Sequence, residues 1–138
     1  VDTSGFYAYL DETDPAHPQA VQLFQTAGKE EWSLLTTNYV VQETAALVQT
    51  RLGWDACDHW LNEVLCAVQV ELVPDELHKM GMARWRQARA RNLSLTDCVS
   101  FAFLEQEGIR DAIVFDRHFA ERGIGLPKRQ KAEENGGL

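Results

Sequence analysis

The sequence is poor in cysteine and in positive charge, and it has no long apolar run. Only three of its 138 residues are cysteines. Their odd number and wide spacing indicate neither a disulfide framework nor a zinc site. Free thiols are typical of a reducing compartment, so we expect a cytoplasmic protein. No apolar stretch is long enough to cross a bilayer, and we therefore expect no membrane association.

The chain has 13 lysine and arginine residues against 21 aspartate and glutamate residues, which gives a formal net charge of −8. Indiscriminate binding to nucleic acid needs a basic face, and this composition argues against it. Two arrangements would overturn that argument. The acidic residues could gather where a divalent cation neutralises them, and the basic residues could gather in one patch.

Length and composition are those of one globular domain. Hydrophobic residues make up 45% of the chain and charged residues 25%, which are ordinary fractions for a soluble fold. We expect one folded domain over residues 1–127, whose first strand is truncated because Val1 reads as the last residue of a strand. The charged and glycine-rich residues 128–138 are expected to form a flexible tail.

Helical and extended patterns alternate along the chain. The expected helices cover 5–12, 18–28, 39–53, 55–65, 75–91 and 94–108, and the expected strands cover 32–37, 68–74 and 112–115, with a short edge strand near Ile124–Leu126. This alternation predicts an α/β fold, a three-layer α/β/α sandwich with a mainly parallel central sheet. Ligands gather at the carboxyl ends of the strands in such sheets.

Two acidic residues follow buried strands. Asp116 comes directly after the apolar run 112–115, and Asp2 follows Val1. Aspartate is a poor strand residue and a good turn residue, so each could simply end its strand. The alternative is that both carboxylates lie in a binding site at the edge of the sheet.

Two more acidic residues lie on apolar helix faces. Glu43 has Val40 three positions before it and Leu47 four positions after it, spacings that place all three on one face. It could be a boundary residue whose head reaches water. Asp97 follows Ser94 by three residues, a spacing that is typical of a capping box at the start of a helix.

Taken together, these four carboxylates could converge on one cleft. Carboxylates held close together without a counter-charge repel each other and favour protonation. A hard divalent cation removes that cost, and Mg²⁺ is typically held by one or two carboxylates together with phosphate oxygens of a substrate. The cluster therefore implies a metal, and the metal implies phosphate chemistry.

Four motifs carry a resemblance to a known family. They are "VDTSGF", "NYVVQETAAL", "LSLTDCVSFAF" and "AIVFDRHF", in this order. The chain resembles the PIN-domain ribonucleases, and most closely the VapC-type toxins of prokaryotic toxin–antitoxin pairs, from residue 1 to about residue 126. The resemblance implies a PIN-like fold and a catalytic site for Mg²⁺ or Mn²⁺ formed by Asp2, Glu43, Asp97 and Asp116, with Thr3 and Ser4 supporting Asp2.

The same resemblance implies a metal-dependent endoribonuclease that acts as a toxin, with a small antitoxin as partner and a homodimer as assembly. Two alternatives remain open, namely an RNA-processing nuclease that is not a toxin and a non-catalytic module that binds RNA or protein. A phosphatase that forms an aspartyl-phosphate is a weaker fourth possibility. The sequence "DTSG" lacks the second aspartate that such an enzyme needs.

Basic residues near two of the motifs are candidates for gripping RNA. Arg86 and Arg89 belong to a basic stretch just before the Asp97 motif, and Arg117 and His118 follow Asp116 directly. They could bind phosphates at the rim of the acidic cleft. The ordinary alternative is a solvated helix face with long side-chain stems packed over its apolar residues.

Overall fold

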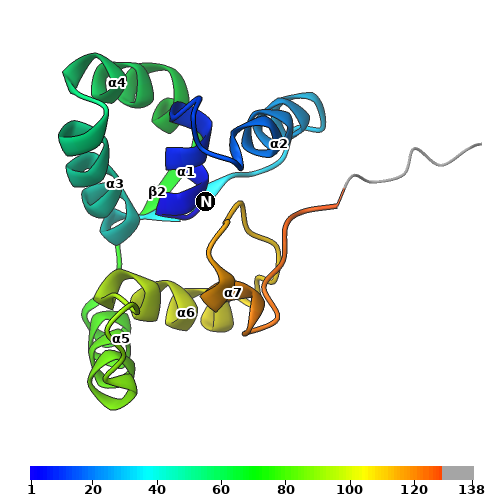
Figure 1. Ribbon diagram of the computed structural model, residues 1–138. Helices are drawn as coiled ribbons and strands as arrows, with labels where there is room; N and C mark the ends of the chain where they lie inside the picture. Colours follow the sequence, from blue (N-terminus) through cyan, green and yellow to red (C-terminus); the bar gives the residue numbers. More distant parts are fainter. Residues whose placement is uncertain (129–138) are drawn as a thin grey trace, which may run out of the picture.

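The computed structural model describes residues 1–128, in which helices surround a short parallel sheet (Figure 1). The predicted tail over 128–138 lies outside these residues except for Lys128. The helices are α1 (Thr3–Leu10), α2 (His17–Lys29), α3 (Asn38–Arg51), α4 (Trp54–His59), α5 (Asp75–Ala88), α6 (Leu95–Glu107) and α7 (Arg117–Ala120), with a π-helical segment η1 (Trp60–Val64) and a 3-10 segment η2 (Leu65–Ala67) after α4. The strands are β1 (Leu35–Thr37) and β2 (Gln69–Glu71).

The sheet is parallel and the first two residues of the chain extend it. Strands β1 and β2 pair in parallel with Leu35 opposite Gln69. The amino group of Val1 donates a hydrogen bond to the carbonyl of Leu35 at 2.6 Å, and the N–H of Asp2 donates to the carbonyl of Ile113 at 3.1 Å. Residues 1 and 2 therefore lie between β1 and the segment around Ile113. The predicted α/β class with a parallel sheet is confirmed.

The expected strand at 112–115 is absent as a regular strand. The segment instead carries an isolated parallel bridge between Asp111 and Gly125. A regular ladder needs consecutive paired residues, and from the sheet a single backbone hydrogen bond reaches this segment, at Ile113. The expected edge strand near Ile124–Leu126 is likewise reduced to the bridging residue Gly125.

Two apolar clusters hold the layers together. One joins α6 and α7 to the segment before Asp116, and in it the rings of Phe101 and Phe119 meet edge to face with centroids 4.7 Å apart. The other joins α1, α3 and η1, where Phe6 and Trp60 meet with centroids 5.7 Å apart. The two clusters share no residue, and each joins helices to extended segments beside the short sheet.

Helix positions follow the predictions more closely than helix ends do. Helix α5 ends at Ala88 rather than at residue 91, because Arg89 takes the left-handed conformation with φ of 47° that often follows a helix. Helix α7 was not predicted, and it begins where the Asp116 side chain accepts a hydrogen bond from the N–H of His118 at 2.9 Å. No helix within residues 1–128 has the length and apolarity that a membrane span requires.

The glycine of the "VDTSGF" motif lets α1 approach the segment that leads to Asp116. A Cβ atom added at Gly5 would lie 2.3 Å from the carbonyl oxygen of Ile113, a backbone atom that cannot move aside cheaply. This close approach keeps Asp2 and Asp116 at the same edge of the sheet.

We expect Gly5→Ala to destabilise the protein by about 1–3 kcal/mol, because the added methyl group overpacks this contact. The midpoint of urea unfolding measures the loss. Gly28→Ala is the matched control, since nothing lies within 4 Å of an added Cβ there and the residue is inside α2. The control should gain up to roughly 1 kcal/mol. Equal midpoints for the two variants would contradict the packing described for Gly5.

Candidate functional site

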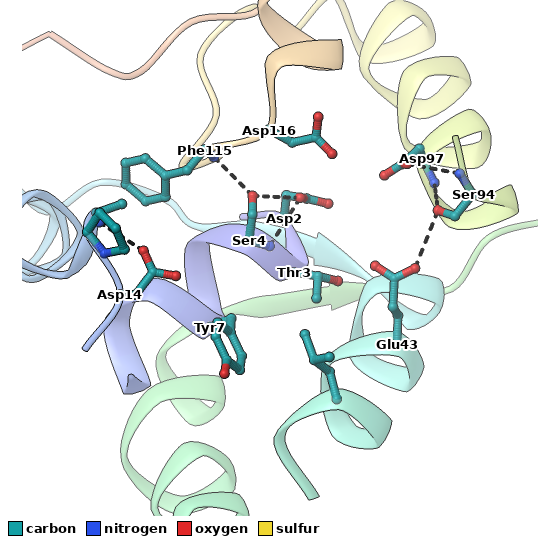
Figure 2. Close-up of a pocket in the computed structure, with 13 residues that line it drawn as sticks. Asp2, Thr3, Ser4, Tyr7, Asp14, Glu43, Ser94, Asp97, Phe115 and Asp116 are labelled. Atoms are coloured by element: carbon teal, nitrogen blue, oxygen red, sulfur yellow. Dashed lines mark hydrogen bonds between the residues drawn. The ribbon is translucent and has the colours of Figure 1, made fainter. Parts of the chain in front are cut away.

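The four predicted acidic residues line one pocket of about 570 Å³ (Figure 2). Asp2 and Asp116 precede α1 and α7, Glu43 lies in the middle of α3, and Asp97 lies in the first turn of α6. Residues that are far apart in the sequence thus meet at the edge where β1 ends. The structure brings together all four carboxylates that the sequence singled out.

Asp2 is held by Ser4 and is left with one oxygen atom unpartnered. Its Oδ2 accepts hydrogen bonds from the N–H and the hydroxyl of Ser4 at 3.2 and 2.9 Å. Its Oδ1 is buried and has no hydrogen-bond partner among the described residues. Burial is the main cause that raises the pKa of Asp2, against the hydrogen bonds from Ser4, which lower it. This oxygen is therefore a buried acceptor that could bind a hydrogen-bond donor or a cation.

Ser4 and Thr3, the predicted supports of Asp2, have different contacts. The Ser4 hydroxyl accepts a hydrogen bond from the N–H of Phe115 at 3.0 Å, so it links Asp2 to the segment that ends at Asp116. The Thr3 hydroxyl accepts from the hydroxyl of Thr44 at 3.2 Å and ties α1 to α3. Ser4 therefore positions the carboxylate directly, whereas the side chain of Thr3 fastens the helix that carries it.

Asp97 takes part in a capping box and also faces the pocket. Its Oδ2 accepts from the N–H of Ser94, and the Ser94 hydroxyl accepts from the N–H of Asp97, both at 3.0 Å. The same hydroxyl donates to Oε2 of Glu43 at 3.4 Å. Burial raises the pKa of Asp97, and the negative charges of Glu43 and Asp116 raise it further. Ser94 thus bridges two acidic side chains that repel each other.

The lining residues leave this negative charge without a basic neighbour. Lysine and arginine are absent from the described residues that line the pocket, and a fifth acid, Asp14, lies on its far side. The Asp14 side chain accepts a hydrogen bond from the N–H of Ala16 at 2.8 Å. Sequence analysis missed Asp14, because a carboxylate in a polar turn looks like any solvated acid.

Helix ends offset part of the repulsion. Asp2, Asp97 and Asp116 all accept hydrogen bonds from backbone N–H groups in or just before the first turn of a helix. The N-terminal end of a helix carries partial positive charge and stabilises a nearby anion. The backbone therefore favours anions here, but three such interactions are insufficient to return the pKa of Asp2 or Asp97 to its ordinary value.

The donor atoms suit a hard divalent cation. Carboxylate and hydroxyl oxygens are the ligands that Mg²⁺ prefers, and the unpartnered Oδ1 of Asp2 is one of them. Residues 1–128 hold no group of three acidic, histidine or cysteine side chains close enough to share one ion. The residues present therefore fit such an ion in the chemistry of their oxygen atoms.

The predicted RNA-binding residues lie outside the pocket wall. Arg86 and Arg89 are exposed at the end of α5, and Arg117 is exposed on α7. His118 is half-buried, with its Nδ1 3.7 Å from Oε2 of Glu121. These four side chains are absent from the pocket lining. A role in RNA binding would place them on its outer rim.

Comparison with known proteins shows what this chain resembles in sequence and in fold. No family model matches the chain. The 23S rRNA-specific endonuclease VapC20 of Mycobacterium tuberculosis, from strains CDC 1551 / Oshkosh and ATCC 25618 / H37Rv, is 29% identical over 125 residues, which cover 90% of this chain and 93% of the relative. The crystal structure of M. tuberculosis VapC20, described as a sarcin–ricin loop cleaving toxin, matches with a TM-score of 0.76 and 28% identity over 89% of this chain and 93% of that one. The resemblance to VapC-type PIN-domain toxins is confirmed in sequence and in fold.

Proposed function

We propose that this chain, which resembles the VapC-type PIN-domain toxins in sequence and in fold, is a metal-dependent endoribonuclease that hydrolyses RNA phosphodiester bonds. The observation that carries the proposal is the convergence of Asp2, Glu43, Asp97 and Asp116 on one pocket, whose lining includes no lysine or arginine among the described residues. In a nuclease, a bound cation neutralises the repulsion between the carboxylates and also interacts with the phosphate of the substrate. A cluster of acids with a purely structural role would gain nothing from carboxylates that repel each other.

In this proposal the four carboxylates hold Mg²⁺ or Mn²⁺. When bound, the ion polarises the scissile phosphate and lowers the pKa of the attacking water. Ser4 keeps Asp2 pointed into the pocket, and Ser94 keeps Glu43 beside Asp97. The N-termini of α1, α6 and α7 lie at the same pocket, and the partial positive charge of a helix N-terminus favours a phosphate there.

The relative VapC20 is named for action on 23S rRNA, and its structure for cleavage of the sarcin–ricin loop. We therefore propose ribosomal RNA as the first substrate to test. The purified protein should cut a sarcin–ricin loop RNA or 23S rRNA in Mg²⁺ or Mn²⁺, stop in EDTA, and resume when the ion is added in excess. Cleavage that persists in EDTA, or no cleavage of either RNA with any divalent ion, would overturn the proposal.

We further propose that the protein is the toxin of a toxin–antitoxin pair, with a small antitoxin partner and a homodimeric assembly. Induced expression of the chain alone in a bacterial host is expected to arrest growth. A housekeeping RNA-processing nuclease expressed in the same way would leave growth unchanged. Colony counts after induction, compared with those for Asp97→Asn, distinguish the two, and equal counts would exclude the toxin.

Arg86 and Arg89 are proposed to grip RNA phosphates beside the cleft. Their joint replacement by alanine should reduce the slope of log K against log salt by about 1.4, since each phosphate contact to single-stranded nucleic acid contributes roughly 0.7. Binding measured at several salt concentrations gives the slope. Lys79→Ala is the control, because Lys79 pairs with Asp75 at 2.9 Å at the opposite end of α5. If the salt dependence of RNA binding is unchanged in the double variant, Arg86 and Arg89 do not bind RNA phosphates.

A further inference from the structure

The pocket has two unlike walls (Figure 2). Glu43 and Asp97 lie on one side, and Asp2 and Asp116 lie in the middle. The aromatic rings of Tyr7 and Phe115 lie on the opposite side together with Asp14, and Pro15 also lines the pocket. The proposed cleavage chemistry involves the carboxylates and gives no role to Tyr7 and Phe115.

Tyr7 and Phe115 are not part of either apolar cluster that holds the fold. Both are half-buried, so each ring keeps part of its surface open to a contact with another molecule. The guanidinium carbon of Arg51 lies 5.7 Å from the Tyr7 ring centroid, so a cation from α3 supports this ring. The Tyr7 ring therefore has a contact from α3 that supports it beside the pocket, and neither ring belongs to the core clusters.

The position of Phe115 is coupled to the acidic centre. Its N–H donates to the hydroxyl of Ser4 at 3.0 Å, and the same hydroxyl donates to Oδ2 of Asp2 at 2.9 Å. Asp116 is the next residue. Phe115 and Asp116 are thus consecutive residues that line the same pocket, so a group bound on the Phe115 ring lies beside the proposed catalytic site.

We propose that Tyr7 and Phe115 form a base-binding subsite, which stacks a nucleobase adjacent to the phosphate that is cut. This inference rests on the proposed ribonuclease function. Unstacked RNA bases bind to aromatic side chains through their faces, which carry no net charge. Stacking therefore supplies affinity that a pocket lined by five carboxylates does not obtain from phosphates. Asp14 lies on the same side and can accept hydrogen bonds from N–H groups of the base.

The test uses a sarcin–ricin loop RNA in which 2-aminopurine replaces one base at a time. The fluorescence of 2-aminopurine falls when it stacks, so binding and stacking are read together. The protein carries Asp97→Asn to keep the RNA intact, and Mg²⁺ is present. We expect one position of the RNA to be quenched, and the further change Tyr7→Leu or Phe115→Leu to weaken its binding roughly 5- to 100-fold and remove the quenching.

Two variants separate stacking from loss of fold. Tyr7→Phe keeps the ring and should bind like the parent protein. Tyr9→Leu removes a neighbouring ring of α1 that packs on Phe24 with centroids 4.8 Å apart, away from the pocket. It should leave the quenching unchanged. Quenching that survives in both Tyr7→Leu and Phe115→Leu, or that is lost equally in Tyr9→Leu, would overturn the subsite.

An abasic substitution completes the test and keeps its outcome separate from that of the proposed function. Removing the quenched base should weaken binding to the parent protein and have little effect on Tyr7→Leu, because the variant has already lost the contact. Equal losses in both proteins would overturn the subsite even if the wild type cuts RNA. Stacking with no cleavage by the wild type would retain the subsite and reject the nuclease.

Discussion

Replacing Asp97 with asparagine is expected to abolish RNA cleavage and, at the same time, to make the metal-free protein more stable. The amide oxygen of asparagine can still accept the hydrogen bond from the N–H of Ser94, so this capping contact is retained. The change removes a buried charge whose pKa is raised by burial and by the charges of Glu43 and Asp116. We expect the cleavage rate to fall more than roughly 100-fold, the upper range for groups that merely support a metal ligand.

Cleavage rates in Mg²⁺ and melting temperatures in EDTA measure the two effects on the same preparations. Asp2→Asn should behave like Asp97→Asn, since its carboxylate is buried with one oxygen unpartnered. Glu63→Gln is the control, because Glu63 is an exposed acid on η1 outside the pocket. If Asp97→Asn melts at a lower temperature than the wild type in EDTA, the charge of Asp97 stabilises the fold rather than destabilising it. If Asp97→Asn cleaves RNA at the rate of the wild type, Asp97 is not part of the catalytic site.

The stabilisation by divalent cations is expected to grow as the pH rises. The pKa values of Asp2 and Asp97 are raised in the folded protein above the usual value of about 3.9. The stability that this difference contributes is fully present below the unfolded pKa and is lost as the pH rises through the folded pKa. We therefore expect the metal-free protein to lose stability over that interval, in which the carboxylates become charged and so able to bind the proposed cation.

Melting temperatures with and without Mg²⁺ at several pH values from 4 to 8 give the comparison. At low pH the two curves should coincide, and at neutral pH saturating Mg²⁺ should stabilise the fold by about 2.7 kcal/mol at 100 times its dissociation constant. The double variant Asp2→Asn, Asp97→Asn should show little stabilisation by Mg²⁺ at any of these pH values. A shift of the same size at every pH would contradict the assigned cause.

The sequence predicted the helices well because their signals are local. Apolar spacing and the Ser94–Asp97 capping box define α6 without knowledge of the rest of the fold. The segment 112–115 was mispredicted because a strand depends on its partners, and only two residues of the chain, Val1 and Asp2, lie between it and β1. Apolar sequence indicated burial correctly, but it could not indicate pairing.

For the candidate site, the four acids were predictable and their surroundings were not. Two alternatives posed by the sequence were that Asp97 caps a helix or faces a cleft, and the structure shows both at once. The same holds for Asp116, which caps α7 and lines the pocket. Asp14 could not be found, because its place on the pocket wall depends on the path of the loop before α2. Tyr7 was missed although it lies in α1 four residues after Thr3 and three after Ser4, spacings that place it on their face of the helix.

The most direct test of the account is a calorimetric titration of the metal-free protein with Mn²⁺ at pH 7.5. The carboxylates of the pocket predict that the wild type and Glu63→Gln bind the ion alike. Asp97→Asn should bind it at least roughly tenfold more weakly. Binding of Mn²⁺ by Asp97→Asn with the affinity of the wild type, or no binding by the wild type, would contradict the claim that these acids form a metal centre.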